Sequence, residues 1–324
     1  AGLCFGAILQ LLGQLPALRD AFSHLRPMLH LQHPGLRRIF ELYVPIIVGL
    51  VITQTSIYIG LGLAYRAGEG GVSWMNYATL IYQFPLGLVA TALSFAILPT
   101  LSRQTADGEF KATLVQGLNL VIILIIPATV GLFVLARPVV ALLYERGKFT
   151  PDDTLQTALV LQLFLLGLSF AAIDQMLIFA FYARKDTFTP SMVGVISVVV
   201  YLVAAILLRG PLGLFSLMIA DSLKQMTHAL ITGFLLSRRL GGFGRTSLLP
   251  TLIKCLAASA LTGGIAALAL SLLSRFPLPS NLLTRAAEVA IPSASAFVAY
   301  IFLLTRLRVS EFQLLLTSVV NRLR

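Results

Sequence analysis

The stretch "NYATLIYQFPLGLVATALSFAILPTLS", residues 76–102, is long and apolar enough to cross a membrane as one helix. Its first half also contains three residues that a plain membrane anchor does not need, namely Gln83, Pro85 and Gly87. Pro85 removes a backbone donor and clashes with the preceding turn, so we expect a bend between Ile81 and Pro85. Gly87 is expected to let another backbone come close. Bent helices of this kind occur near substrate sites in membrane transporters.

The composition of the whole chain indicates the same class of protein. Of its 324 residues, 57% are hydrophobic and only 11% are charged, whereas about 25% of the residues in a soluble domain are charged. The formal net charge is +11. The basic residues lie in short gaps between apolar runs, which favours membrane orientation and lipid headgroups over nucleic acid. We therefore expect an all-α polytopic membrane protein that has membrane lipids, and no nucleic acid, as partners.

Apolar runs separated by charged or Pro/Gly clusters predict about eight full membrane spans after a partial one. The predicted full spans are 41–64, 74–101, 112–136, 155–182, 190–208, 212–236, 250–273 and 286–305. Residues 1–15 are apolar but too short to cross, so we expect the end of a truncated membrane helix, followed by a cytoplasmic amphipathic linker at 16–40. Residues 306–324 repeat apolar side chains at helical spacing, which predicts an interfacial amphipathic tail.

The distribution of lysine and arginine predicts the orientation. Roughly 15 of them lie in the gaps and tail on one side of the spans, and roughly 7 lie in the gaps on the other side. The richer side is expected to be cytoplasmic, which places the C-terminus in the cytoplasm.

Enzyme signatures are absent from the sequence. It contains no phosphate-binding loop, no HExxH, no GxSxG and no CxxC, and it has only thirteen acidic residues. His30 and His33 have no acid or cysteine at a useful spacing for a metal site. We therefore expect no enzyme, no catalytic residue, no metal and no cofactor.

Ionisable residues inside the spans are the informative ones, because each costs about 2.5–3.5 kcal/mol on insertion scales and usually faces a bundle interior or a water cavity. Asp174 lies beside Gln175 in the span 155–182, and Asp221 and Lys224 lie three residues apart in the span 212–236. Two interpretations of the latter pair stay open: a mutually neutralising pair that locks helices together, or part of a substrate or ion path.

Uncharged polar residues add to this pattern. Gln54 lies in the first full span and Asn119 in the third, while Asn76 and Gln83 could partner carbonyls freed at Pro85. Singly each favours an interhelical hydrogen bond. Together they indicate spans packed around a semi-polar centre, as in a transporter.

Two of the charged gaps are explained by local structure. In "FYARKDTFTP", residues 181–190, Thr189 is expected to cap a helix that begins at Pro190. In "ALLYERGKFTPDDT", residues 141–154, Thr150 and the following acids are expected to begin the next helix.

Three stretches of this sequence resemble, in their order and spacing, the MurJ (MviN) family of lipid II flippases. They are the two gaps just described and "GGVSWMNYATLIYQFPLGLVATALSFAILPTLS", residues 70–102. That family belongs to the multidrug/oligosaccharidyl-lipid/polysaccharide exporter superfamily. The resemblance implies fourteen membrane helices, arranged as two six-helix lobes around a cavity and a final pair that borders a groove for the lipid tail. Residues 41–236 would be the second lobe and 250–305 the final pair, with the N-terminal lobe of the same protein as a missing partner.

The resemblance also implies an activity. Family members move a polyprenyl-pyrophosphate-linked peptidoglycan precursor, lipid II, across the bacterial cytoplasmic membrane by alternating access, and cationic residues hold the pyrophosphate. Ser73 matches a functionally important serine of the family, and Gln83 falls where members carry Glu or Gln. Leu80 falls where many members carry an essential arginine. This departure leaves two alternatives open: an exporter of another lipid-linked oligosaccharide, or a non-transporting membrane scaffold.

Overall fold

The computed structural model describes residues 2–16, 34–65, 70–243, 248–275, 281–309 and 312–313, and the regular structure within them is helical. The chain divides into two compact units, Ala1–Glu41 and Leu42–Arg324. The first contains α1 (Gly2–Gln14) and the beginning of α3 (Pro34–Tyr65), which continues into the second. α3 therefore begins seven residues before the predicted span. The remainder of the predicted linker, residues 17–33, lies outside the described residues, as do residues 310–311 and 314–324 of the predicted tail.

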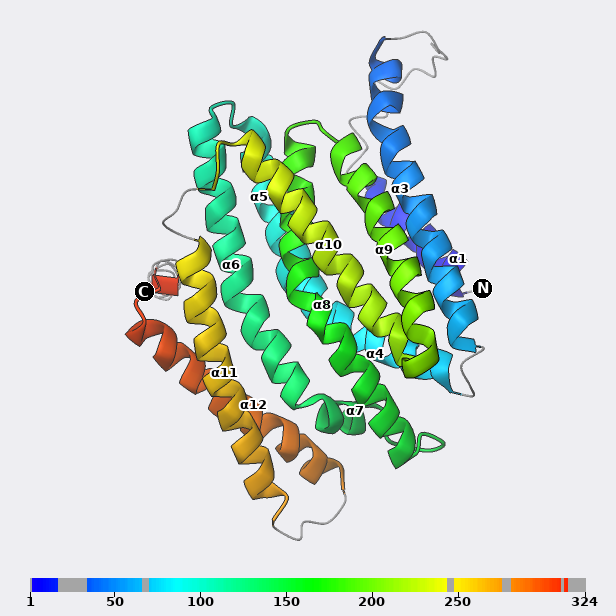
Figure 1. The fold of residues 1–324 in the computed structure, drawn as a ribbon, viewed down its shortest axis with the longest axis vertical. Coiled ribbons are helices and arrows are strands. Elements are labelled where there is room, and N and C mark those ends of the chain that lie inside the picture. Colours follow the sequence, from blue (N-terminus) through cyan, green and yellow to red (C-terminus); the bar gives the residue numbers. More distant parts are fainter. Residues whose placement is uncertain are drawn as a thin grey trace. The chain divides into compact units, whose positions relative to one another are not determined.

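The second unit contains the other helices, which Figure 1 shows as long rods. Their bounds are α4 Gly71–Pro85, η2 Leu86–Thr91, α5 Ala92–Arg103, α6 Asp107–Val134, α7 Ala136–Tyr144, α8 Pro151–Ala183, α9 Phe188–Leu212, α10 Phe215–Arg239, α11 Leu248–Leu273 and α12 Leu282–Arg306. The predicted all-α membrane fold is confirmed. Among the described residues, seven helices are long and apolar enough to cross a membrane, one fewer than predicted. α10 is the eighth, and the polar residues in its middle lower its hydropathy.

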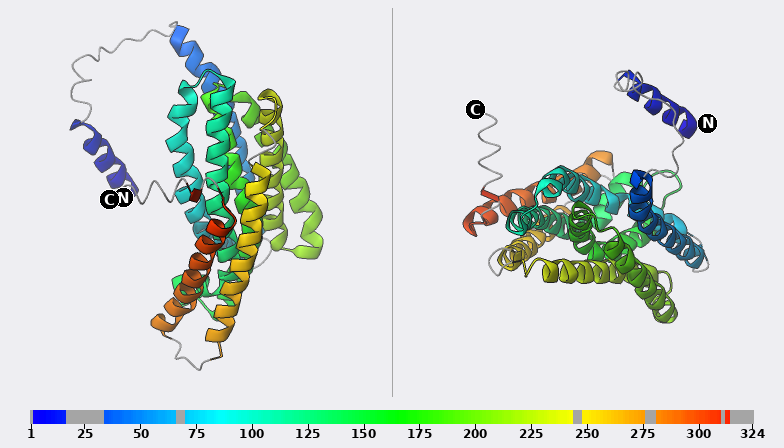
Figure 2. Two further views of the ribbon diagram at one scale, coloured as in Figure 1. Left: turned by 90° about the vertical axis from the view of Figure 1, so that its left-hand side faces the viewer. Right: turned by 90° about the horizontal axis from the view of Figure 1, so that it is seen from above.

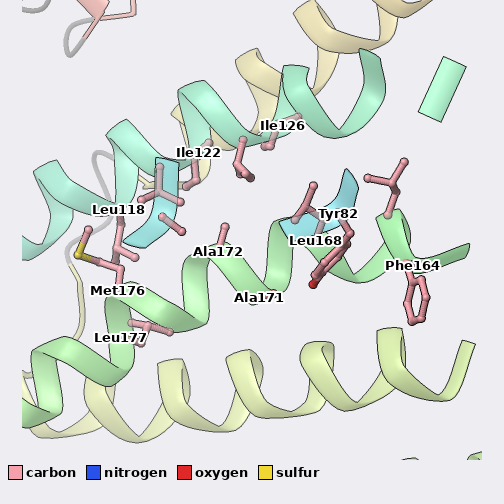
Figure 3. Packing of buried hydrophobic residues seen from close by; sticks show 14 of the residues in the cluster. Tyr82, Leu118, Ile122, Ile126, Phe164, Leu168, Ala171, Ala172, Met176 and Leu177 are labelled. Carbon is pink, nitrogen blue, oxygen red and sulfur yellow. The ribbon is translucent and has the colours of Figure 1, made fainter. Parts of the chain in front are cut away.

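The core of the second unit is built around α8. This helix packs against α4, α6, α7 and α10, and Figure 2 shows it among them from two further directions. In Figure 3 the buried side chains of α6 and α8 meet, and Tyr82 of α4 packs against Phe164 of α8 with ring centroids 6.0 Å apart. Between apolar helices in lipid, close van der Waals packing replaces the hydrophobic effect as the source of association.

The closest approach of α8 to α10 depends on a small residue. A Cβ placed on Gly167 would lie 2.9 Å from Cα of Ser222, so glycine is needed at this crossing. The hydroxyl of Ser222 donates to the carbonyl of Leu163 at 2.7 Å. α10, the most polar of the long helices, is thereby held tightly on the central helix.

Where the sequence predicts a bend at Pro85, the structure shows a change of helix type. α4 continues through Pro85, and the next six residues, Leu86–Thr91, form a π-helix before α5 begins. Because Pro85 has no backbone N–H to donate, the regular series of α-helical hydrogen bonds is broken there, and the wider turn of the π-helix follows. A Cβ on Gly87 would meet no atom of the described residues within 4 Å. The expected close backbone approach at Gly87 is therefore wrong for this part of the chain.

The motif at residues 141–154 joins several helices. Thr150 and Asp153 form a capping box at the start of α8, as predicted, and Asp153 also accepts a hydrogen bond from Nε1 of Trp74 at 2.9 Å. Glu145 pairs with Arg285 of α12 at 2.7 Å. The charges of this motif therefore hold α4, α8 and α12 in register.

The motif at residues 181–190 joins the opposite ends of the helices. Arg184 pairs with Asp107 at the start of α6, and Asp186 pairs with Arg239 at the end of α10. The predicted helix start is wrong: α9 begins at Phe188, and Asp186 accepts the backbone N–H of Thr189 at 2.9 Å. The carboxylate of Asp186 therefore accepts the backbone N–H at this turn, and Thr189 itself donates to it.

Asp186 makes stability depend on pH. Burial raises the pKa of its carboxyl, but hydrogen bonds from Thr189 and the Arg239 guanidinium outweigh burial and hold this pKa below its usual value. The contribution of Asp186 is therefore complete above the unfolded-state pKa of about 3.9 and is lost as the pH falls through the lower folded-state value. We expect Asp186→Asn to lower the free energy of unfolding by about 1 kcal/mol near neutral pH, a figure kept small because Arg239 is half exposed.

Thermal unfolding of the parent and Asp186→Asn proteins in detergent micelles measures this difference. The two midpoints are expected to converge when the pH is lowered below the folded-state pKa of Asp186. A difference of the same size in acid and at neutral pH would contradict the assignment.

Candidate functional site

One face of α4, continued by Gly87 at the start of η2, brings together most of the site residues predicted in the span 74–101 and just before it. Ser73, Asn76, Leu80, Gln83 and Gly87 are spaced by three or four residues, so they lie on one side of the helix. All five are exposed, and Leu80 is 60% exposed. We call these five residues the α4 face. Pro85 is buried on the opposite side, so it shapes the helix and does not belong to the face.

The chemistry of the α4 face is polar but uncharged. Gly71 to Ser102 contains no charged residue. The amides of Asn76 and Gln83 can each donate and accept hydrogen bonds, and the hydroxyl of Ser73 can do both. Such groups suit sugar hydroxyls and peptide groups. Leu80, at the centre of the face, has no charge with which to hold a phosphate.

A second group of polar residues follows one side of α10. Asp221, Lys224, Gln225, His228 and Thr232 recur at helical spacing on the helix that packs against both α8 and α9. We call this set the α10 stripe. Its charges are thereby brought into the interior of the second unit.

Asp221 and Lys224 form an ion pair at one end of the stripe. Nζ of Lys224 donates to the Asp221 carboxylate. The side chain of Asp221 is only 21% exposed and that of Lys224 only 19%. The Lys224 ammonium also lies 5.5 Å from the ring centroid of Tyr201 on α9. A Cβ on Gly60 of α3 would lie 2.5 Å from the Tyr201 hydroxyl, so a larger residue there would require the Tyr201 side chain to shift. Of the two interpretations left open by the sequence, this geometry favours the neutralising pair.

Asp174 meets a residue that the sequence interpretation did not single out. Oδ1 of Asp174, on α8, lies 2.7 Å from Nδ1 of His228 on α10, and both side chains are nearly buried. Nε2 of His228 lies 3.2 Å from the carbonyl oxygen of Pro190 on α9. The signal was available, because His228 follows Lys224 by four residues on the same side of α10. Gln175, next to Asp174, is half-buried.

Gln54 and Asn119 belong to neither group. Gln54 is exposed on α3, and its neighbours Thr53 and Ser56 donate to carbonyls of their own helix, at 2.9 and 2.7 Å. Asn119 is fully buried on α6. The predicted site residues therefore separate into the α4 face, the α10 stripe with Asp174, and these two individual positions.

An apolar pocket lies where α10, α11, α6 and α8 meet. Its volume is about 330 Å³, and its lining includes Leu118, Ile122, Leu177, Phe234, Leu249 and Leu252. Such a lining suits a hydrocarbon chain.

The sequence is similar to known transporters. The family model "Lipid II flippase MurJ" matches residues 1–286. The probable lipid II flippase MurJ of Vibrio cholerae is 33% identical over 230 residues, which are 70% of this chain and 44% of the relative. The corresponding protein of Rhizobium meliloti is 34% identical over 277 residues, 82% of this chain and 51% of the relative. The chain thus spans about half the length of the curated relatives it matches.

The fold is similar to solved structures. One described as "Lipid II flippase MurJ, inward closed conformation" superposes with a TM-score of 0.70 at 21% identity, covering 90% of this chain and 59% of the other. A multidrug resistance MATE family transporter superposes with a TM-score of 0.57 at 12% identity, covering 85% of this chain and 66% of the other. At these identities the structures establish a shared fold.

Proposed function

Because the chain belongs to the lipid II flippase MurJ family, we propose that the protein containing it moves lipid II across the bacterial cytoplasmic membrane by alternating access. The observation that carries the proposal is the family match over residues 1–286, together with relatives named as lipid II flippases. Membership implies a multi-pass membrane transporter. The excess of arginine and lysine on one side of the spans supports a cytoplasmic C-terminus.

The α4 face is the best candidate for the part of this chain that contacts the polar portion of the substrate. Its amides and hydroxyl match the sugars and the peptide of a peptidoglycan precursor in their capacity to donate and accept. The apolar pocket beside α11 offers a place for part of the polyprenyl tail. As the family resemblance implies, a second lobe would form the opposite wall of the cavity.

The pyrophosphate needs cations that the α4 face does not supply. Gly71 to Ser102, which contains that face, has no charged residue, and Lys224 in the interior is already paired with Asp221. We therefore expect the cations that hold the pyrophosphate at the α4 face to come from the other lobe. Leu80 keeps one alternative open, export of a different lipid-linked oligosaccharide.

Complementation tests the proposal. The full-length gene is expressed in a bacterium depleted of its own lipid II flippase, and growth, cell shape and the accumulation of lipid II on the cytoplasmic side are measured. We expect growth to be restored and lipid II to stop accumulating. Normal expression and membrane insertion without rescue would count against lipid II as substrate and would favour another lipid-linked oligosaccharide.

A further inference from the structure

The buried imidazole of His228 is surrounded by hydrogen-bond acceptors. Nδ1 faces the carboxylate of Asp174 at 2.7 Å and the hydroxyl oxygen of Thr232 at 3.2 Å. The Thr232 hydroxyl donates to the carbonyl of His228 itself at 2.6 Å, so its oxygen is left to accept from Nδ1. Nε2 faces the carbonyl oxygen of Pro190 at 3.2 Å, and a carbonyl can only accept.

A neutral imidazole beside an ionised Asp174 cannot satisfy this environment. With its single proton on Nδ1, the lone pair of Nε2 would face the carbonyl oxygen of Pro190. With the proton on Nε2, the lone pair of Nδ1 would face a carboxylate at 2.7 Å. A flipped ring would place carbon atoms at both positions and lose both hydrogen bonds. Leaving a buried polar atom unpaired costs about 1–3 kcal/mol, so each of these states is disfavoured.

One additional proton satisfies every partner. It lies between Nδ1 of His228 and Oδ1 of Asp174, either on the nitrogen, as imidazolium and carboxylate, or on the oxygen, as imidazole and carboxylic acid. In both placements Nε2 carries its own proton and donates to Pro190, and the pair has no net charge. Loss of the additional proton leaves a neutral imidazole and a carboxylate, and one of the hydrogen bonds must break.

Among the residues that the structure describes, few other ionisable groups surround this pair. From α8, Tyr182 lies within electrostatic range of Asp174. From α10 itself, Lys224 is one turn away and is paired with Asp221. α9 contributes no ionisable residue between Phe188 and Val200. The protonation of the pair therefore depends mainly on its own two residues.

We propose that Asp174 and His228 form a proton-binding site whose occupancy holds α9 on α10. The site joins three helices: α8 supplies Asp174, α10 supplies His228, and α9 supplies the Pro190 carbonyl in its first turn. The two side chains are 8% and 12% exposed, so a proton can reach the site while bulk water is largely excluded. Release of the proton to water frees the N-terminal turn of α9 from the His228 imidazole.

Nitrogen NMR of the full-length protein in lipid nanodiscs tests the protonation state. The protein is labelled with ¹⁵N-histidine, and the signals that disappear in His228→Asn identify His228. Near neutral pH we expect Nε2 to carry a proton and Nδ1 to share one with Asp174. In Asp174→Asn we expect a neutral imidazole. The matched control is Asp221→Asn/Lys224→Gln, which removes two charges from the same helix without a net change, and it is expected to leave the His228 signals as in the parent.

The attachment of α9 is measured by spin-label distances between exposed positions Met192 on α9 and Phe234 on α10. Raising the pH from about 6 to about 9 is expected to broaden the distance distribution in the parent and to have no effect in His228→Asn. A neutral His228 with a bare Nε2 in the parent, or identical pH responses of parent and variant, would overturn the proposal. The parent spectrum decides the first point even if a variant fails to fold. Both measurements are independent of which lipid the protein transports.

Discussion

Replacing Lys224 with methionine is expected to lower the free energy of unfolding of the full-length protein by about 3–5 kcal/mol. The substitution preserves the length and the apolar stem of the side chain, so packing against Tyr201 is largely kept. It leaves the carboxylate of Asp221 in the interior without its ammonium partner, and an unpaired buried charge is the costly outcome of breaking such a pair. Equilibrium unfolding in micelles or bicelles measures the change.

The double variant Asp221→Asn/Lys224→Met is the control for this prediction. It removes both charges, and replacement of a whole buried ion pair by neutral groups is often close to neutral in stability. We expect it to recover most of the stability that Lys224→Met loses. If the double variant were as unstable as the single one, the loss of stability would come from altered packing and not from the unpaired carboxylate of Asp221.

Leu80→Asp is expected to reduce transport by a factor on the order of 100, whereas Leu80→Asn is expected to retain most of it. Leu80 is exposed at the centre of the α4 face, and both replacements fit there without displacing a packed neighbour. They differ in charge alone. A carboxylate placed against an anionic pyrophosphate lipid costs several kcal/mol, and each 1.4 kcal/mol is a factor of ten.

Complementation and lipid II accumulation at matched membrane levels measure this pair of variants. Leu80→Arg extends the series, since it introduces the residue that many family members carry at this position. Higher lipid II transport by Leu80→Arg would indicate a lipid II flippase in which Leu80 weakens binding of the pyrophosphate. Equal activity of the Asp and Asn variants would show that the α4 face does not approach the anionic part of the substrate.

The positions of the helices could be predicted well from the sequence, because apolar runs of about 20 residues bounded by charges have one stable arrangement in lipid. Each predicted span corresponds to a helix or to a helix interrupted by a π-turn. The start of α3 lies seven residues before the predicted one because the charges of Arg37 and Arg38 place these residues in the gap before the span. They continue the helix, and Arg37 pairs with Glu41 one turn later.

The pairing of side chains could be predicted only where it is local. Asp221 and Lys224 lie one turn apart, and their pairing follows from helix geometry alone. Asp174 and His228 are 54 residues apart, and nothing in the sequence states which sides of α8 and α10 meet. For the same reason nothing in the sequence indicates that Asp186 pairs with Arg239 while also accepting a hydrogen bond from Thr189.

The π-helical segment has a consequence for insertions and deletions. Along the buried side of α4 and α5 the sequence steps from Ile81 to Pro85 by four residues, then from Pro85 to Ala90 by five, and then to Ser94 by four. The segment therefore absorbs one extra residue and keeps the two halves of the helix in phase. Deleting one residue between Leu86 and Thr91 would therefore leave a regular α-helix with α5 still in phase with α4, whereas inserting one more residue would turn α5 by about 100° relative to α4, because an α-helix advances by that angle per residue. Such an insertion would carry the buried Ser94 away from the bundle, so the segment tolerates a deletion better than an insertion.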